Sequence, residues 1–321
     1  MGAYLAKRVV QLLPILLLIL ILNFVLIHLA PGDPSLYLIG DAPVSDEFVA
    51  EVRGRMGLDQ PLLTQLWIYL VAVAHGDFGY SFVSRAAVSD VILARLPATL
   101  LLMGTQYVIA VGGGILLGAV SARWQRSALD TGITLFSVIG YAMPVFWLGQ
   151  ILMLIFALHL RWLPAQGMLS LRYDLTPMQY TLDLIQHLVL PALTLAFFNL
   201  ALIVRLTRAN MLQVLRLEFV MFARSKGISE RAVLFRHALK NAILPVVTII
   251  GLNVKTLVAG AVLTETVFAW PGLGRLTYDA IYARDYPVLM GMFVLIGALV
   301  IIGNLVTDLV YAWLDPRIRY Q

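Results

Sequence analysis

Six long apolar stretches dominate the pattern of hydrophobic and polar positions along the chain. Five of them contain no Asp, Glu, Lys or Arg, and the sixth is interrupted by Lys255 alone. A helix of roughly 20 residues crosses the hydrocarbon core of a bilayer, and a lone segment in lipid satisfies its backbone hydrogen bonds only as a helix. The pattern therefore predicts six transmembrane helices, within residues 9–30, 97–122, 131–160, 187–204, 241–264 and 287–307.

The first stretch also resembles a cleavable signal peptide, because Lys7 and Arg8 precede it. Its 22 apolar residues exceed the hydrophobic region of an ordinary signal peptide, and no A-x-A cleavage site precedes Pro31. We therefore expect residues 9–30 to stay in the protein as a membrane anchor.

Composition supports a membrane protein over a soluble enzyme. Hydrophobic residues make up 60% of the 321 residues and charged residues 13%, against about 45–50% and about 25% in ordinary soluble domains. The chain contains no Cys, which excludes disulfides, thiolate metal sites and a Cys nucleophile. The net charge of +5 is too small to indicate a nucleic-acid partner. No Ser/His/Asp or paired-carboxylate constellation and no metal-ligand spacing emerges, so we expect no catalytic residue and no metal site.

The distribution of Lys and Arg predicts the orientation. These residues are concentrated in alternate connecting segments, above all in the eight basic positions between Arg205 and Lys240. By the positive-inside rule, those segments and both termini face the cytoplasm. Residues 31–96 then form a small extracytoplasmic insert, with a helix over 45–56 and a turn over 57–61. We therefore expect three parts: residues 1–30 with the first span, the insert 31–96, and a core of five spans over 97–321.

The cytoplasmic loop 205–240 contains the most informative pattern. Gly227 interrupts a helical pattern, as a residue with positive φ at a helix end does. Ser229 is a candidate N-cap for a second helix, in which Ala232, Phe235 and Leu239 fall on one face. The loop is thus expected to form a helix, a sharp corner and a second helix with an apolar ridge. Contact with anionic lipid also explains the basic residues, whereas the flanking spans argue against nucleic acid.

The loop resembles the coupling loop of ABC importer permeases, in which two small residues and three variable positions precede a Gly. Ala223 takes the second small position and Gly227 the Gly, whereas Met221 and Phe222 depart from the general motif. The whole chain resembles the peptide and nickel branch of these permeases through strings found in order along it: APGDP (30–34), GLDQPL (57–62), GDFGYS (76–81), RLPATL (95–100), WLP (162–164), HLVLPALTL (187–195), ARSKG (223–227), RHALKNAILPVVT (236–248), ETVFAWPGLGRL (265–276), RDYP (284–287) and YAWLDPRIRY (311–320).

This resemblance implies an all-α integral membrane protein with the six-helix fold of ABC type I importer permeases, in a bacterial or archaeal cytoplasmic membrane. The sequence contains no G-x-x-x-x-G-K-[ST], so ATP and Mg are expected on separate ATPase chains and no cofactor on this one. The implied partners are a second, homologous permease, two cytoplasmic ABC ATPases, an extracytoplasmic solute-binding protein and membrane lipid. The solute stays open among dipeptides, oligopeptides, glutathione and nickel chelates.

The resemblance also assigns residues. The expected ATPase-coupling residues are Glu218, Ala223, Lys226, Gly227, Ser229, Ala232, Phe235 and Leu239. The expected residues of the translocation path or gate are Lys255, Glu265, Trp270, Asn304 and Asp308, because ionisable groups within spans usually face a cavity or a partner. Pairing of Lys255 with Asp308, and hydrogen bonding of Asn304 and Asp308 between helices, are the structural alternatives.

Two other classes of function compete with a permease subunit. A secondary transporter acting without ATPase subunits would need carboxylates near the middle of several spans, whereas Lys255 is the one charge near the middle of a span here. A membrane receptor or scaffold could use the basic loop to bind a signalling protein. Copurification of ATPase subunits with the chain would distinguish the importer from both.

Overall fold

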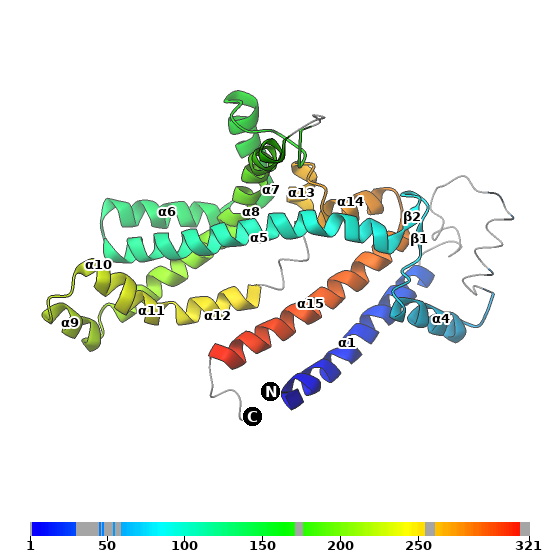
Figure 1. Cartoon of the computed structure of the whole chain (residues 1–321), viewed down its shortest axis with the longest axis horizontal. Helices are drawn as coiled ribbons and strands as arrows, with labels where there is room; N and C mark the ends of the chain where they lie inside the picture. The colour runs from blue at the N-terminus through cyan, green and yellow to red at the C-terminus, as the bar shows by residue number, and fades with distance from the viewer. Residues whose placement is uncertain are drawn as a thin grey trace. The chain divides into compact units, whose positions relative to one another are not determined.

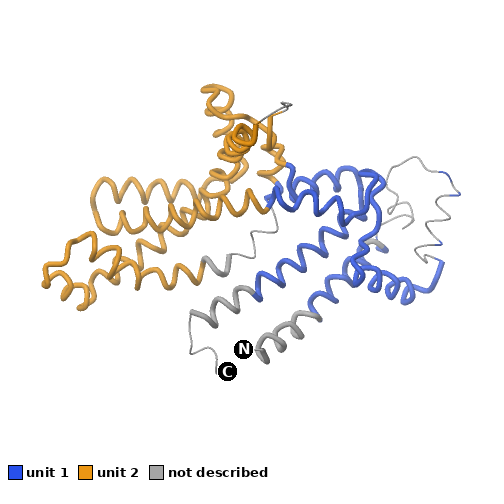
Figure 2. Tube along the Cα trace, viewed as in Figure 1, with its two compact units in different colours: residues 1–99, 258–262, 271–309 blue, residues 100–257, 263–270, 310–321 orange. Residues whose placement is uncertain are grey.

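The computed structural model describes residues 2–29, 59–170, 176–253 and 261–314 and the single positions 45, 47 and 54, with backbone alone at 2–13, 27, 250–253 and 306–314. The described residues are mostly helical (Figure 1). The chain separates into two compact units (Figure 2). Unit 1 contains residues 1–99, 258–262 and 271–309, and unit 2 contains 100–257, 263–270 and 310–321.

Unit 1 combines the N-terminal part of the sequence with segments from its last quarter. Its elements are α1 (Gly2–Leu29), α4 (Leu62–Ala74), the strands β1 (Tyr80–Ser81) and β2 (Ala86–Ala87), the beginning of α5 (Val88–Arg123), α14 (Leu273–Tyr282) and most of α15 (Tyr286–Leu314). The two strands pair antiparallel, with Tyr80 opposite Ala87. The core of this unit is formed by buried apolar residues from α5, α14 and α15, namely Val88, Ile92, Leu273, Leu276, Ala280, Val288 and Met292.

A buried polar contact fixes the β-hairpin of unit 1 to the beginning of α15. The Ser81 hydroxyl donates a hydrogen bond to the Asp285 carboxylate, and both residues are buried. The other carboxylate oxygen of Asp285 accepts from the backbone N–H of Val288 at 3.3 Å, which caps α15. The strings GDFGYS and RDYP, which lie about 200 residues apart, therefore meet at one structural contact.

Unit 2 contains the remaining helices. They are the rest of α5, then α6 (Ala128–Ala142), α7 (Val145–Leu152), the π-helix η1 (Met153–His159), α8 (Pro177–Val214), α9 (Glu218–Ser225), α10 (Glu230–Ala232), the π-helix η2 (Val233–Ala238), α11 (Leu239–Ala242), α12 (Leu244–Asn253) and most of α13 (Val262–Val267). Its central core joins α5 and α8 through Ala110, Ala196, Leu200, Ile203 and Val204, with Val246 of α12.

Glycines allow α5 and α8 to approach each other closely. A Cβ atom built on Gly114 would lie 2.7 Å from Cβ of Ile203, and one on Gly118 would lie 2.8 Å from the carbonyl oxygen of Val204. Carbon atoms in contact are normally about 3.5–4.0 Å apart, so a larger residue would push the helices apart. The same holds between α6 and α8, where a Cβ on Gly140 would meet the Phe197 ring at 2.6 Å.

The predicted spans are recovered in part. Within the described residues, three helices are long and apolar enough to cross a membrane, and a bent helix pair makes a fourth if it is one span. The three are α5, α8 and residues 286–305 of α15, and the pair is α6 with α7–η1. The helix α1 covers the stretch 9–30, whereas residues 254–260 of the stretch 241–264 lie outside the described residues. Of the insert, the expected helix 45–56 also lies mostly outside them.

The stretch 131–160, predicted as one span, is a bent pair of helices. The helix breaks between α6 and α7, which are bent by 111° relative to each other. Proline disfavours helical backbone in the residue before it, and Met143, which precedes Pro144, is extended at φ −77° and ψ 134°. The pyrrolidine ring is tolerated at a helix start, so Pro144 directly precedes α7.

We predict that Gly118→Ala destabilises the protein. The added methyl group would lie 2.6 Å from Cβ of Thr207, and such overpacking costs about 1–3 kcal/mol. The matched control is Gly112→Ala, because nothing lies within 4 Å of the atom that it adds. Thermal unfolding in detergent should show a lower midpoint for Gly118→Ala and not for the control. Equal midpoints for both variants would contradict the close packing of α5 on α8.

Candidate functional site

The long helix α8 leads directly into the candidate site. It has 38 residues, and at 1.5 Å per residue it is about 57 Å long, whereas the hydrocarbon core is about 30 Å thick. The predicted span 187–204 is therefore the middle of a continuous helix. The loop expected from residue 205 onward remains helical as far as Val214, and it turns into α9 at Glu218.

The corner after α9 has the geometry of a Schellman motif. Gly227 has φ +73°, its N–H donates to the carbonyl of Arg224 at 2.9 Å, and the N–H of Ile228 donates to the carbonyl of Ala223 at 3.4 Å. Ala223 is buried together with Val220 and Val233, and Ile228 packs against them. The prediction of a positive φ at Gly227 is confirmed, and Ala223 is small because it lies inside the corner.

The second helix of the corner begins where Ser229 was expected to cap it. Ser229 occupies the N-cap position of α10, and its carbonyl accepts from the N–H of Val233 at 2.9 Å. Its side chain makes no capping hydrogen bond. The boundary was predicted correctly, but the stabilising contact is a backbone one.

The apolar ridge of Ala232, Phe235 and Leu239 is not a single exposed face. The π-helix η2 occupies residues 233–238, and its wider turn of i→i+5 hydrogen bonds breaks the 3.6-residue period on which the ridge was predicted. Phe235 is 40% exposed, whereas Ala232 is half-buried and Leu239 packs inward against the core cluster of α5 and α8.

An exposed apolar surface instead lies on α9. Phe219, Met221 and Phe222 are all exposed, while Val220, between the first two, and Ala223, after the third, are buried. Met221 and Phe222 are the two residues that depart from the general coupling motif, so the departure places large apolar side chains on the surface. The Lys226 ammonium lies 4.5 Å from the centre of the Phe222 ring, a cation–π contact.

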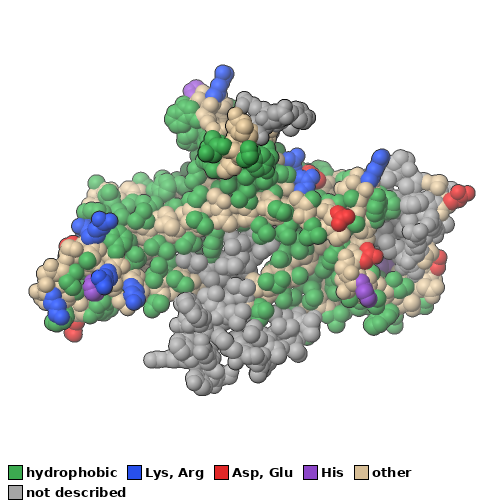
Figure 3. All heavy atoms as spheres, viewed as in Figure 1, with side chains coloured by type: hydrophobic (Ala, Val, Ile, Leu, Met, Phe, Trp, Pro, Cys, Tyr) green, Lys and Arg blue, Asp and Glu red, His purple; other side chains and the backbone are tan. Residues whose placement is uncertain are grey.

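Basic residues surround this apolar surface. Figure 3 shows Lys and Arg side chains over the α9 to α11 region. The exposed basic side chains of this region and of the turn before it are Arg216, Arg224, Lys226, Arg231, Arg236 and Lys240. Glu218, in the first turn of α9, is also exposed. Arg224 forms an ion pair with Glu230, at 2.9 and 3.3 Å, but both side chains are exposed and such pairs stabilise a fold by at most about 1 kcal/mol.

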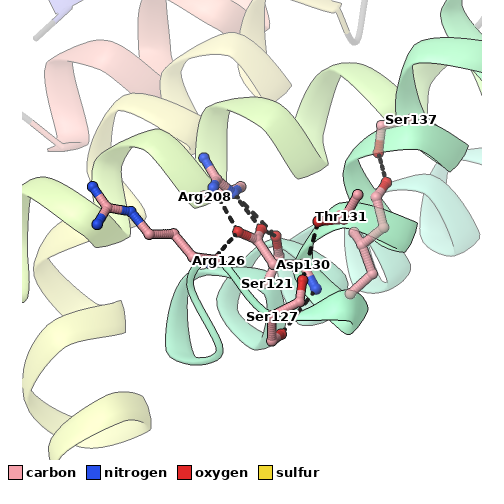
Figure 4. A network of polar contacts seen from close by, with 8 residues as sticks. Ser121, Arg126, Ser127, Asp130, Thr131, Ser137 and Arg208 are labelled. Atoms are coloured by element: carbon pink, nitrogen blue, oxygen red, sulfur yellow. Dashed lines mark hydrogen bonds and ion pairs between the residues drawn. The ribbon is translucent and has the colours of Figure 1, made fainter.

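A polar network that the sequence did not reveal joins α5, α6 and α8 (Figure 4). The Arg208 guanidinium of α8 donates to both carboxylate oxygens of Asp130 in α6, at 2.7 and 2.8 Å. The hydroxyl of Ser121 in α5 donates to Asp130 and accepts from Arg208 at 3.1 Å. The backbone N–H of Arg126 donates to Asp130 at 2.8 Å. Asp130 is 4% exposed, so three helices meet at one buried carboxylate.

One sequence signal marks part of this network. Ser127, directly before α6, accepts a hydrogen bond from the N–H of Asp130 at 3.2 Å, and Asp130 stands in the first turn where acidic residues are favoured. Hydropathy and charge counting place Asp130 and Arg208 on the cytoplasmic side, each as a single residue and not as a pair. Nothing in the sequence pairs two residues that lie 78 positions apart.

The expected path and gate residues are only partly placed. Glu265 of α13 and Trp270 are both fully buried in unit 2, and the N–H of Trp270 donates to the carbonyl of Glu265 at 2.8 Å. Asn304 is half-buried on α15, and Asp308 stands on the same helix with its backbone alone described. Lys255 lies outside the described residues, so its pairing with Asp308 stays a prediction.

Two family models match the chain except for residues 104–113 and 321. Residues 114–320 match the model of the family described as "Binding-protein-dependent transport system inner membrane component". Residues 1–103 match the model of the N-terminal region of such membrane components. The two models together cover both units of the structure.

Three relatives are similar over the full length of both chains. The chain is 42% identical to a di/tripeptide transport system permease protein of Pseudomonas aeruginosa and 43% identical to an oligopeptide transport system permease protein of Bacillus subtilis. It is 38% identical to a dipeptide transport system permease protein of Escherichia coli. Each comparison covers 100% of this chain and of the relative. The chain therefore belongs to the family of inner membrane components of binding-protein-dependent transport systems.

Proposed function

We propose that this chain is a permease subunit of an ATP-driven ABC importer and forms half of a translocation pathway for di- and oligopeptides. Similarity over the full length to proteins named as peptide permeases is the observation that supports the solute class most directly. The helical corner at the end of α8, with its exposed apolar surface, supports coupling to separate ATPase subunits.

The proposed architecture is the six-helix fold of ABC type I importer permeases. Residues 1–30 form the cytoplasmic end and first span, 31–96 an extracytoplasmic insert, and 97–321 the core with five spans. Both termini face the cytoplasm. Three observations support this arrangement: the apolar helices α5, α8 and α15, the helix α1 over the first apolar stretch, and the basic surface of the corner.

The proposed complex contains a second, homologous permease, two cytoplasmic ABC ATPases that bind ATP and Mg, and an extracytoplasmic solute-binding protein. The basic residues around the corner also contact anionic lipid. The family description, which names a binding-protein-dependent transport system, supports the involvement of a binding protein. Nucleic acid has no place in this proposal, because the predicted spans tie the basic loop to the bilayer.

In this complex the outer side of the corner docks on an ATPase. Phe219, Met221, Phe222 and Phe235 supply exposed apolar area, whose burial contributes about 25 cal/mol per Å². Gly227 and Ala223 fix the angle of the corner, and Leu239 anchors it to the core cluster. Glu218, Lys226, Ser229 and Ala232 complete the surface and its boundaries. Closure of the ATPases on nucleotide moves the docked corner, and the spans exchange inward-facing for outward-facing packing.

Fewer contacts support the proposed path and gate residues than support the corner. Glu265 and Trp270 are buried at one turn of the chain, which suits a gate element. Lys255, Asn304 and Asp308 are proposed to line the path because polar groups in spans are costly unless they face a cavity or a partner.

Transport by the reconstituted complex tests the function. Vesicles that contain this chain, its second permease and both ATPases should accumulate radiolabelled trialanine when the binding protein and Mg-ATP are supplied. Vesicles with this chain alone should not. Accumulation by the chain alone, without ATP, would show a secondary transporter and contradict the proposal.

A charge on the exposed surface of the corner should uncouple transport. We expect Phe222→Glu and Phe235→Glu to insert in the membrane normally but to lose most trialanine uptake, because a carboxylate cannot be buried unpaired in an apolar contact. Phe222→Leu and Phe235→Leu are the matched apolar controls and should retain uptake. Full uptake by both Glu variants would exclude this surface from ATPase docking.

The backbone conformation at Gly227 should also be needed for coupled transport. Gly227→Val places a β-branched residue at φ +73°, which is strained, whereas Gly227→Asn tolerates that conformation better. Since no atom lies within 4 Å of the added Cβ, backbone strain rather than crowding is what the substitution changes. Uptake per inserted protein should fall in Gly227→Val and be largely kept in Gly227→Asn. The corner geometry is not needed for coupling if the two variants transport alike.

A further inference from the structure

The inner side of the corner packs directly beside the Asp130 network, which is the set Ser121, Asp130 and Arg208. Six buried apolar residues connect η2 and α11 of the corner to α5 and α8: Ala119, Ala122, Met211, Leu234, Ala238 and Ala242. On α5, Ala119 and Ala122 stand on either side of Ser121, and on α8, Met211 follows Arg208 by one turn. A displacement of the corner therefore reaches the two helix turns that hold the network.

At its first turn, α6 is held by the network and not by apolar packing. Ala128, Leu129 and Thr131 are exposed there, and Asp130 is the one buried side chain of the turn. Apolar contacts of α6 with the α5–α8 core begin at Ile133, in the next turn, and continue where Phe136 and Gly140 meet Phe197. The first turn of α6 is therefore connected to α5 and α8 through the Asp130 carboxylate, and apolar packing joins it from Ile133 onward.

We infer that Asp130 and Arg208 are positioning residues for transport, because their ion pair makes α6 move together with α5, α8 and the corner. This inference rests on the proposed function, since it assigns a role within the coupling of that importer. A bidentate guanidinium–carboxylate pair fixes both distance and orientation. Burial of Asp130 excludes water that could replace Arg208 at the carboxylate, while the Arg208 side chain itself is 29% exposed.

Variants of similar size distinguish a positioning role of the ion pair from a role in filling space between the helices. Asp130→Asn keeps the size of the side chain but offers one acceptor oxygen where two are used. Arg208→Lys keeps the charge but loses the planar pair of donors. Both variants weaken the contact between α6 and α8 while they leave polar partners at the site. The chain offers a matched control in Asp279→Asn, which removes an exposed ion pair with Arg275 on α14, outside the corner.

The experiment measures the number of ATP molecules hydrolysed per trialanine transported, in vesicles that hold the complete importer. We expect this ratio to rise about fivefold or more in Asp130→Asn and Arg208→Lys, the lower end of the range for a lost coupling between sites. The ratio should not change in Asp279→Asn. An unchanged ratio in both network variants would overturn the inference. Failure of the wild-type complex to transport trialanine would contradict the proposed function instead.

A distance measurement distinguishes coupling from mere stability. Because the chain contains no Cys, spin labels can be attached at Leu129→Cys on α6 and Ser225→Cys on α9, both exposed, without removing native thiols. In the otherwise wild-type complex, the distance between the labels should stay narrowly distributed with and without ATP. In Asp130→Asn it should broaden when ATP is bound.

Two results of this measurement would overturn the inference. One is a distribution in Asp130→Asn that is as narrow as in the otherwise wild-type protein. The other is loss of assembly with the ATPases in both network variants, which would assign the network to folding and not to coupling.

Discussion

The close packing of α5 on α8 is the contact on which the rest of unit 2 depends. Glycine at positions 114 and 118 lets the backbones approach to distances that no side chain permits. At that separation Ser121 of α5 reaches Arg208 of α8, and the alanines that flank Ser121 accept Leu234 and Ala238 of η2. Larger residues on α5 would disrupt both the Asp130 network and the apolar contacts that hold the corner, because both are formed by the same face of the same two helices.

The inner and outer sides of the corner differ in the interactions that their residues make. Its inner side is fixed by burial of small and branched apolar residues, which is insensitive to salt and needs no partner. Its outer side exposes large apolar residues among basic ones, and its ion pair is solvated. Salt weakens such exposed charges, so the affinity of this surface for a partner protein must come mostly from Phe and Met, while the charges steer the approach.

The sequence predicted features that depend on a single residue or on composition. Hydropathy located the apolar helices α1, α5, α8 and α15, and the positive φ at Gly227 followed from its position in a helical pattern. Features that depend on distant residues were missed: the Asp130–Arg208 pair joins positions 78 apart, and charge counting treats each residue singly. The prediction of an apolar ridge through Leu239 was wrong for a local reason. Hydrophobic periodicity assumes 3.6 residues per turn, and a π-helix has a wider turn. An apolar stretch reports length but not the size of the bend at Met143, although Pro144 is a residue that kinks or starts a helix.

The continuous helix α8 gives a reason why the corner and the buried turn at Glu265 and Trp270 belong to one mechanical element. Arg208, at the end of α8 nearest the corner, and Thr194 are 14 residues apart, about 21 Å along an unbroken helix. At Thr194 the helix meets α7, because a Cβ on Gly149 would lie 3.2 Å from Thr194 and 3.0 Å from the ring of Phe268. Phe268 belongs to the turn that contains the two buried residues, and its carbonyl accepts from the N–H of Gly167 at 2.9 Å. Since packed helices transmit shifts as rigid bodies, a displacement of α8 at the network reaches this turn without any intervening flexible segment.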